Sequence, residues 1–532
     1  MLSELTRRAR LHARAVRDGT RPVPLHERSV GDIVQVRRGR SLLEAVVVDR
    51  FDAWALRDEV LGEVVEALAA AGVPHRVLPS PDAEPHRIVI DGADAGRART
   101  ILQAGLGPPH HATVITGPGR GPARPVAALP EVAAGDVVRI FVPQVSTSGR
   151  LLPTRTLGVD LELWPRTSGA TPSADGPSLP PGTLVAPRPN GYVRHLRPGA
   201  LGQPTAATPS PTLEQVTFPI DVVYTWVDSD DPGWQRDFAE ARGLPGSAVG
   251  HESSWSPSRF TSRDELRYSL RSVAAYASWV RTIFIVTNGQ VPAWLDTDHP
   301  QIRVVRHDDI FADPSHLPTF SSHAIEANLH RIPGLAQHYL YLNDDVFLAR
   351  PLRPEHFFTG SGLLRYFPSM VAVDEGPASP DELPVVQAFK NARTLLEERF
   401  DRRPATRPRH TPHPQRRDVL EDIDAACPDL VARTSAARFR SPTDLSVASQ
   451  LQAWWADATA RAVPSGTTYE FIDLGDPHAD ARIERMLVRA DLDCFCLNET
   501  TQVDEQIAAS RVERILTALL PFPSPYEITD QD

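Results

Sequence analysis

Lysine is almost absent from this 532-residue chain, because Lys390 is the one lysine among 56 lysine and arginine residues. A basic side chain that binds a phosphate here must therefore be arginine or histidine. Cysteine is scarce too, and three residues do not form a disulfide framework. Cys494 and Cys496 share one face of an expected strand, and we interpret them as a buried apolar pair rather than as metal ligands.

The sequence also lacks a long apolar run, a secretory signal and a surplus of positive charge. Apolar stretches such as Val64–Val73 fall far short of the roughly 20 residues of a membrane span, so we expect a cytoplasmic protein. The formal net charge of −11 at pH 7 argues against a nucleic-acid partner. Arginines between positions 7 and 17 fit a solvated helix face, and peripheral contact with the inner face of the plasma membrane is the open alternative.

Residues 1–164 are expected to form a small α+β domain with an accessory role, since they hold no catalytic constellation. Strands are expected at Leu43–Val48, His75–Leu78, His86–Ile90 and Ala112–Thr116, and helices at Ala53–Ala71 and Ala93–Gln103. This order of elements predicts a ferredoxin-like fold. Residues 165–215 are rich in proline and read as a linker or a wrapping arm.

Residues 216–532 are expected to form an α/β catalytic domain with a mainly parallel sheet and a helical C-terminal part. Apolar runs typical of buried strands lie at Ile220–Val227, Thr282–Thr287, Ile302–Arg306 and Tyr339–Leu342. Helical periodicity separates them at Ser262–Ala277 and Ser321–Arg331. Further helices are expected at Pro384–Phe400, Arg416–Ala426, Thr443–Ala460 and Thr501–Leu520.

Carboxylates follow two of these strands. Asp228, Asp230 and Asp231 follow the first, where ligands of open α/β sheets bind, although a polar turn that caps the next helix explains them equally well. Asp344 and Asp345 end the fourth strand and are followed at once by apolar residues. Two uncompensated carboxylates near a core are costly, so this pair predicts a divalent cation or an arginine beside it.

Basic residues form two further candidate sites. Arg263, Arg267 and Arg271 recur on one helix face, where they either clamp a diphosphate or form salt bridges. His410 or His413 has the chemistry of a general base, and Arg440 is suited to brace a phosphoryl group. Taken alone, these last two segments are typical of exposed basic loops.

Together and in this order, the segments resemble the conserved blocks of the stealth family. That family includes bacterial capsular polysaccharide phosphotransferases and the animal N-acetylglucosamine-1-phosphate transferase. The matching segments are Ile220–Pro232, Phe260–Pro292, Thr319–Pro351, His410–His413, Phe439–Arg440 and Cys496–Asn498 with Pro521–Pro525. Two departures stand out: Ser229-Asp230 replaces the usual Gly-Ser, and Glu499 replaces a common Asp.

The resemblance implies a reaction in which an acceptor hydroxyl of a glycan attacks the sugar-bearing phosphorus of a UDP-sugar, UDP-N-acetylglucosamine being one candidate, and UMP leaves. It implies that Asp344 and Asp345 hold Mg²⁺ or Mn²⁺, that His410 or His413 acts as base, and that Arg440 stabilises the transferring charge. The substrate-binding residues it implies are Trp226, Asp228, Asp231, Arg263, Asp264, Glu265, Arg267, Asn288, Glu326, His330, Asn343 and Asn498. A metal-dependent glycosyltransferase and a non-catalytic scaffold of polysaccharide assembly are the alternatives, and the sequence predicts no oligomeric state.

Overall fold

The computed structural model describes residues 28–38, 41–78, 85–116, 119–169, 171–173, 176–189, 193–197, 199–202, 211–243, 251–256, 259–489 and 491–528. The arginines between positions 7 and 17 lie outside these ranges. The chain forms two compact units. Unit 1 combines Met1–Thr212 with Leu487–Asp491 and Pro521–Pro523, and unit 2 holds the remaining residues.

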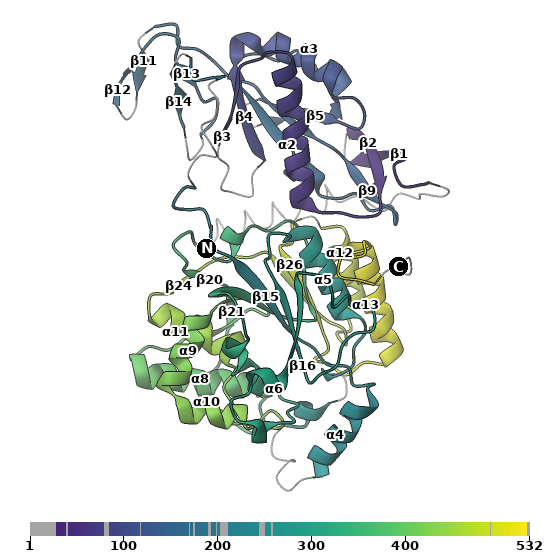
Figure 1. Ribbon diagram of the computed structural model, residues 1–532, viewed down its shortest axis with the longest axis vertical. Helices are drawn as coiled ribbons and strands as arrows, with labels where there is room; N and C mark the ends of the chain where they lie inside the picture. The colour runs from purple at the N-terminus through teal and green to yellow at the C-terminus, as the bar shows by residue number, and fades with distance from the viewer. Residues whose placement is uncertain are drawn as a thin grey trace. The chain divides into compact units, whose positions relative to one another are not determined.

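Unit 1 is built on a mixed sheet with two helices on one face (Figure 1). The strand order is β3 (His75–Leu78), β4 (His86–Asp91), β10 (Val159–Trp164), β8 (Val137–Phe141), β5 (His111–Thr116) and β6 (Gly119–Arg120), with β7 (Arg124–Pro125) also paired to β5. The helices are α2 (Ala53–Ala70) and α3 (Ala95–Gly105). Helix α2 begins where Asp52 caps the Trp54 and Ala55 amides, and it buries Val60, Val64 and Leu68.

The expected ferredoxin-like topology is wrong, although the expected order of helices and strands is present. Strand β2 (Ser41–Val48) does not join the large sheet. It pairs with β1 (Ile33–Arg38) and β9 (Gln144–Ser146) in a separate sheet, where Val34, Val36, Ala45 and Val47 form a small core of their own. The place beside β4 is taken by β10, a strand from much later in the chain.

The proline-rich stretch contributes four short strands to unit 1. Strands β11 (Thr171–Ser173) and β12 (Gly176–Leu179) form one hairpin, and β13 (Leu184–Val185) pairs with β14 (His195–Leu196). Leu184 and Leu196 pack against Trp164 of the main sheet. This part of the stretch therefore wraps the domain that precedes it.

Unit 2 is centred on a five-stranded sheet in the order β17 (Ile302–Arg306), β16 (Ile283–Thr287), β15 (Ile220–Thr225), β18 (His338–Asn343) and β23 (His413–Arg416). The first four strands are parallel, and β23 runs antiparallel to β18. These four parallel strands are the ones expected from the apolar runs. Burial of nearly every side chain in β15, β16 and β18 explains those runs.

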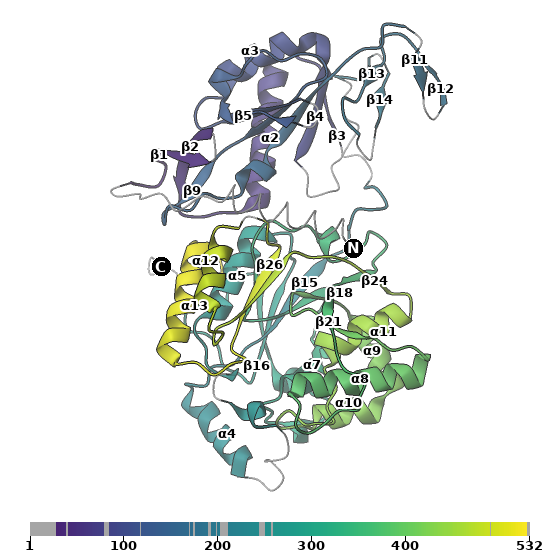
Figure 2. The ribbon, with the colours of Figure 1, turned by 180° about the vertical axis from the view of Figure 1, so that it is seen from behind.

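Unit 2 also contains a second, three-stranded sheet and two groups of helices (Figures 1 and 2). The sheet holds β19 (Val346–Leu348), β26 (Cys494–Asn498) and β25 (Tyr469–Asp473). Helix α5 (Glu265–Tyr276) packs on β19. One group contains α12 (Ala479–Leu487) and α13 (Glu505–Leu519), and the other contains α8 (Pro384–Phe400), α9 (Arg417–Ala426), α10 (Pro428–Ser435) and α11 (Gln452–Ala458).

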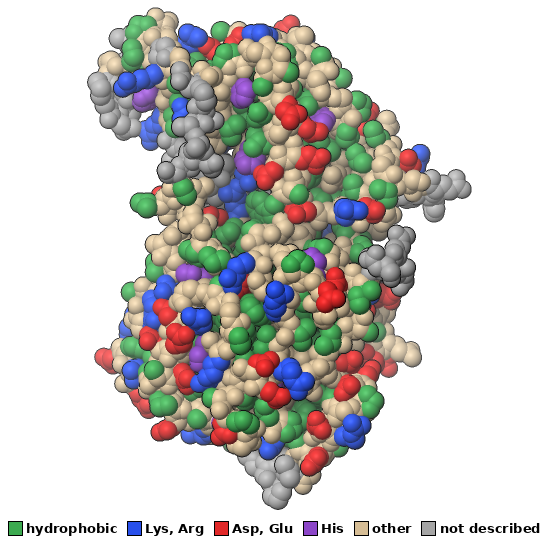
Figure 3. All heavy atoms as spheres, viewed as in Figure 1, with side chains coloured by type: hydrophobic (Ala, Val, Ile, Leu, Met, Phe, Trp, Pro, Cys, Tyr) green, Lys and Arg blue, Asp and Glu red, His purple; other side chains and the backbone are tan. Residues whose placement is uncertain are grey.

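The helix expected over Thr443–Ala460 starts later than the sequence suggests. A π-helical turn covers Val447–Leu451, and α11 follows it. Asp444 and Leu445 belong instead to a hydrogen-bonded loop, which is described with the site. Across the described residues, no helix has the length and apolarity that crossing a bilayer demands. On the face drawn in Figure 3, acidic and basic side chains are interspersed over unit 2.

Candidate active site

The ends of three parallel strands meet at one edge of the central sheet. Thr225, the last residue of β15, is in register with Asn343 of β18 and Val286 of β16. Gln290 ties the turns after β15 and β16 together, because its Oε1 accepts from the Asp228 amide (3.0 Å) and its Nε2 donates to the Asp228 carbonyl (2.7 Å). The polar segments that follow these strands are therefore brought side by side, as expected for a parallel sheet.

The carboxylates after β15 serve the turn itself. Asp228 Oδ1 accepts from the Asp230 amide (2.9 Å), and Asp231 Oδ1 accepts from the Trp234 amide (2.6 Å) in the first turn of α4 (Pro232–Gly243). The Trp226 amide donates to the Val286 carbonyl (3.1 Å), so its backbone extends the sheet. These bonds are those of the helix-capping turn, one of the two interpretations that the sequence left open. A ligand contact through Asp228 or Asp231 stays a prediction.

Asp345 lies at the centre of a group of hydrogen-bond donors. Its Oδ2 accepts from Asn498 Nδ2 (2.6 Å) and lies 3.3 Å from Cys496 Sγ, while its Oδ1 lies 3.2 Å from His410 Nε2. Burial opposes ionisation of Asp345, but the charge and hydrogen bond of His410, together with Asn498, outweigh it and hold its pKa below the ordinary value. The structure thus brings Asp345, His410 and Asn498 together from three distant segments.

Asp344 has a different environment, in which negative charge accumulates. Burial, followed by repulsion from Glu265 and Asp345, raises the pKa of Asp344 well above its ordinary value. Burial also raises the pKa of Glu265, although the Arg263 amide donates to its Oε2 at 2.5 Å. Buried carboxylate oxygens that repel one another are the ligands that Mg²⁺ and Mn²⁺ prefer, so these side chains fit a divalent cation.

A second, mixed set of ligand atoms lies close by. Asp345, His410 and Cys496 each offer one atom, and the three atoms lie within 4.8 Å of one another. Cys496 is therefore more than the apolar strand residue that the sequence suggested. Asp345 already hydrogen-bonds to both His410 and Cys496, so the oxygen-rich side of the pair, towards Asp344 and Glu265, fits a hard divalent cation better than this mixed set does.

The two candidate histidines have opposite environments. Burial lowers the pKa of His410, but Asp345 outweighs this and the net shift is upward. His413 is buried in β23, opposite Tyr341, and burial together with His410 lowers its pKa to about 3. The exposed basic loop proposed for this segment is thus wrong for His413, because its side chain is buried in a strand and stacks with Tyr341. Only His410 combines access with a carboxylate partner.

All three arginines of the expected helix row have acidic partners, although only Arg267 and Arg271 lie on α5 and Arg263 precedes it. Arg263 is ion-paired with Glu499 (2.8 Å) and Glu505 (2.6 Å). Arg267 and Arg271 both contact Glu527, at 2.5 and 2.8 Å. The structure therefore favours the salt-bridged helix over the diphosphate clamp. Glu499, one of the two departures from the family pattern, places its carboxylate against Arg263.

The remaining predicted residues divide between the site and the surrounding framework. His330 is buried and lies 3.4 Å from Asp424 Oδ2, and burial lowers its pKa to about 4, so its surroundings are those of a packed core residue. Asn288 makes a long contact of 3.4 Å with the Gln290 amide. Asp264 is half-exposed and adopts a left-handed φ of 64° before α5. Asn343 Oδ1 is buried and has no hydrogen-bond partner among the described residues.

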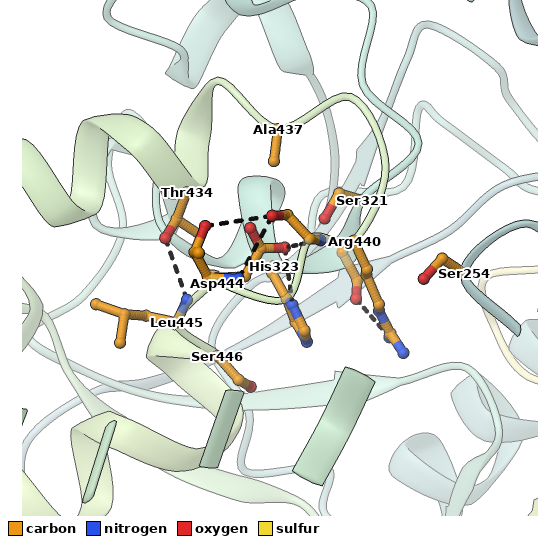
Figure 4. A network of polar contacts seen from close by, with 12 residues as sticks. Ser254, Ser321, His323, Thr434, Ala437, Arg440, Asp444, Leu445 and Ser446 are labelled. Carbon is orange, nitrogen blue, oxygen red and sulfur yellow. Dashed lines mark hydrogen bonds and ion pairs between the residues drawn. The ribbon is translucent and has the colours of Figure 1, made fainter. Parts of the chain in front are cut away.

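Arg440 lies in a loop that is fixed from several sides (Figure 4). Asp444 Oδ2 accepts from the Ser441 amide (2.8 Å) and lies 3.2 Å from His323 Nδ1. The Leu445 amide donates to Thr434 Oγ1 (3.1 Å). Arg440 Nη2 itself donates to Ser322 Oγ (2.7 Å). These bonds hold the guanidinium in place before any substrate arrives.

Glu326 supports the same loop from α7 (Ser322–Glu326). Its carboxylate accepts from Ser446 Oγ (3.1 Å), the Ser449 amide (3.1 Å) and Ser449 Oγ (2.8 Å). Burial lowers the pKa of Arg440, and the charge of Glu326 opposes that shift. Glu326 thus acts on Arg440 as a buried counter-charge, which the sequence did not distinguish from a ligand contact.

Sequence comparison places these elements in known conserved regions. Residues 218–244, 259–366 and 409–457 match conserved regions 1, 2 and 3 (CR1, CR2 and CR3) of Stealth proteins. The chain belongs to the Stealth family. Phe260–Pro292 and Thr319–Pro351, given above as separate matching segments, both fall in conserved region 2, whereas His410 and Arg440 fall in region 3.

Whole-chain relatives agree with this assignment. The chain is 38% identical to the exopolysaccharide phosphotransferase SCO6021 of Streptomyces coelicolor over 89% of this chain and 90% of that protein. It is 38% identical to SCO6023 of the same species, with 91% and 84% covered. It is 32% identical to the exopolysaccharide phosphotransferase CpsY of Mycobacterium tuberculosis (strain H37Rv), with 96% and 94% covered. The predicted family is confirmed, and the Stealth chain is a phosphotransferase.

Proposed function

We propose that this Stealth protein transfers a sugar 1-phosphate from a UDP-sugar, such as UDP-N-acetylglucosamine, to a hydroxyl of an exopolysaccharide. The observation that carries the proposal is the contact between His410 and Asp345 at the strand edge, 3.2 Å from Nε2 to Oδ1. A histidine oriented by a carboxylate is the arrangement that activates a hydroxyl nucleophile. The names of the relatives support exopolysaccharide as the acceptor class.

In the proposed reaction, the acceptor oxygen forms a bond to the phosphorus that carries the sugar. The bond from that phosphorus to the bridging oxygen breaks, and UMP leaves with the electron pair. His410 receives the proton of the acceptor hydroxyl. Since Nε2 faces Asp345, Nδ1 is the nitrogen whose lone pair is available, and the carboxylate stabilises the imidazolium that results.

Arg440 and the paired aspartates have separate roles in stabilising the negative charge of the phosphates. Arg440 is preorganised by Ser322 and its own loop, so it stabilises phosphoryl oxygens without rearrangement. Asp344 and Asp345, with Glu265 beside them, would hold Mg²⁺ or Mn²⁺, which offsets negative charge on the donor phosphates. Asn498 holds the Asp345 carboxylate in position through its 2.6 Å hydrogen bond.

Product analysis tests the proposal. The purified chain is incubated with a panel of UDP-sugars and a glycan acceptor, and the products are examined by mass spectrometry. A phosphodiester product together with UMP supports sugar-phosphate transfer. A product without phosphorus, together with UDP, would make the protein a glycosyltransferase instead. Neither product, in a chain shown to be folded, would favour the scaffold.

We further propose that unit 1 has an accessory role and that the enzyme works in the cytoplasm, at or near the inner face of the plasma membrane. The buried charges of unit 1 are paired with one another, as in the bond from Arg139 Nε to Asp160 Oδ1 (2.7 Å) and that from Arg188 Nε to Glu162 Oε1 (2.8 Å). Such pairs suit a framework more than a catalytic centre. A chain without residues 1–210 should then still release UMP from a small donor.

A further inference from the structure

The three arginines at and before α5 are already paired with carboxylates, so other groups of this chain are needed to bind the phosphates of the substrate. Arg263, Arg267 and Arg271 are each held by carboxylates. Among the residues that the structure describes, Arg259 and Arg440 form no ion pair. Both lie in unit 2, and the charge of Arg440 acts on Arg259 as well as on His410.

An aromatic cluster brings these two arginines together from distant parts of the chain. The cluster consists of Trp234, Phe238, Phe260, Phe320 and Phe439. Phe320 and Phe439 are stacked with 5.4 Å between ring centroids, and Trp234 lies 5.1 Å from Phe260 and 5.4 Å from Phe320. Three of these phenylalanines have a polar neighbour in the chain: Arg259 precedes Phe260, Ser321 follows Phe320, and Arg440 follows Phe439.

Backbone contacts fix the geometry further. The Phe320 amide donates to the Arg438 carbonyl (2.7 Å), which joins the Ser321 segment to the Arg440 loop. Arg259 Nη1 donates to the Ser254 carbonyl (2.9 Å), and its guanidinium lies 5.5 Å from the Phe260 ring centroid. In Figure 4 the Ser254 hydroxyl is turned towards the end of the Arg440 side chain.

Several donors in this region are buried without a partner. Ser254 and Ser321 are fully buried, and within the described part of the chain their hydroxyl oxygens make no hydrogen bond. The same holds for Arg440 Nε. A buried polar group without a partner costs about 1–3 kcal/mol, and such groups in native proteins call for a reason. All three of these atoms can donate, so the ligand that satisfies them must be rich in acceptor oxygens.

The charges point to the same kind of ligand. Burial, and then the neighbouring charge of Arg440, lower the pKa of Arg259 well below its ordinary value. Glu326 offsets part of the charge of Arg440, but two partly buried guanidinium groups that repel each other are unfavourable until a further anion lies between them. A phosphate group supplies both the negative charge and the acceptor oxygens, and arginine is the residue whose planar fork matches it.

We propose that Arg259 binds a substrate phosphate in a cradle that it forms with Arg440, Ser254 and Ser321. This inference rests on the proposed function, because it names the residues that hold the phosphates of the substrate beside His410. It assigns a binding role to Arg259, which sequence patterns did not single out. The phosphate belongs either to the diphosphate of the nucleotide-sugar or to a phosphodiester already present in the acceptor.

Calorimetric titration of the full chain with pyrophosphate tests the cradle. Arg259→Gln should weaken pyrophosphate binding about 10- to 100-fold, the range of a lost charge-assisted contact. Arg259→Lys should fall between that variant and the unaltered chain, because the charge remains but the fork does not. Arg433→Gln is the matched control, since Arg433 is exposed on α10 and should leave binding unchanged.

Ser254→Ala separates ligand binding from folding. If the Ser254 hydroxyl donates to the bound anion, its removal should weaken pyrophosphate binding several-fold. The melting temperature of the free chain should stay the same or rise. Loss of stability without loss of binding would make Ser254 a structural residue and would count against the cradle. Circular dichroism of each variant verifies that it is folded.

The outcomes also separate this inference from the proposed function. If the unaltered chain forms phosphodiesters but Arg259→Gln binds pyrophosphate normally, the cradle is wrong and the function stands. If the chain forms only phosphorus-free products while Arg259→Gln still loses pyrophosphate binding, the cradle is supported and the proposed sugar-phosphate transfer is wrong. Parallel titrations with UDP and with an oligosaccharide phosphodiester show which substrate supplies the phosphate.

Discussion

The imidazole of His410 lies against the carboxylate of Asp345, with 3.2 Å between Nε2 and Oδ1. Asp345 is the second member of an acidic pair that follows a buried strand, whereas His410 comes from a segment 65 residues further along the chain. The contact singles out one of the two histidines proposed from the sequence. It also gives Asp345 a role as partner of the base, beside its proposed role at the cation.

His410→Ala should lower kcat by about 10²- to 10⁴-fold, the usual contribution of a general base. UMP release at saturating donor measures this. His413→Ala is the matched control, because His413 is buried in β23 and its change should mainly lower the melting temperature. If the double variant kept its rate within a few-fold of the unaltered enzyme, neither histidine would be the base.

Asp344→Asn should abolish the response to a divalent cation. In the unaltered chain, Mn²⁺ at 100 times its dissociation constant should stabilise the fold by about 2.7 kcal/mol. The variant should show no such rise in melting temperature, while its metal-free form should be at least as stable, because one of the repelling carboxylates has been neutralised. Asp381→Asn, at an exposed position, serves as control. An equal Mn²⁺ response in both variants would remove Asp344 from the cation site.

The parallel strands of unit 2 could be predicted because their burial on both faces leaves a local signature, a continuous apolar run. The partners of charged side chains could not. Glu527, for example, lies 260 residues from Arg267. No local pattern reveals that its carboxylate pairs with Arg267 and Arg271. Likewise, His413 looked like a loop residue, since its pairing with Tyr341 depends on a strand that the tract of prolines and arginines conceals. Arg259 stands at the first residue of conserved region 2, just before the segment that the sequence analysis matched, and its proposed role follows from what the fold places around it.

Glu527→Gln should lower the free energy of unfolding rather than the affinity for donor. Glu527 is buried and accepts from Arg267, Arg271 and the Ser524 amide, so the change leaves two partly buried arginines without their counter-charge. Breaking such a pair typically costs about 3–5 kcal/mol. Urea unfolding and donor KM, measured side by side, distinguish the two roles. A large rise in KM with unchanged stability would restore the diphosphate clamp on α5.

The stability of the fold should decline below pH 6.5, in part because of His307. Burial lowers the pKa of His307 to about 4, whereas in the unfolded chain it titrates near 6.5. The unfolded state therefore binds more protons between these values, and stability present above pH 6.5 is lost as the pH falls towards 4, by about 3 kcal/mol in all. His307→Gln should flatten this slope in urea titrations at several pH values, whereas His478→Gln, at an exposed position, should not. Identical slopes in all three chains would rule out this contribution.

Arg440→Lys probes the chemistry itself. Phosphoryl transfer depends mostly on positioning and charge stabilisation, and the Arg440 guanidinium is held for this by its bond to Ser322 Oγ at 2.7 Å. Lysine keeps the charge but cannot reproduce a planar, two-pronged contact. We therefore expect kcat to fall strongly with little change in donor KM, the pattern of an interaction made mainly in the transition state. Ser322→Ala, which removes the brace but keeps the guanidinium, should show the same pattern more weakly. A variant that kept its kcat and only raised KM would instead make Arg440 a ground-state clamp for the phosphate, sharing that role with Arg259.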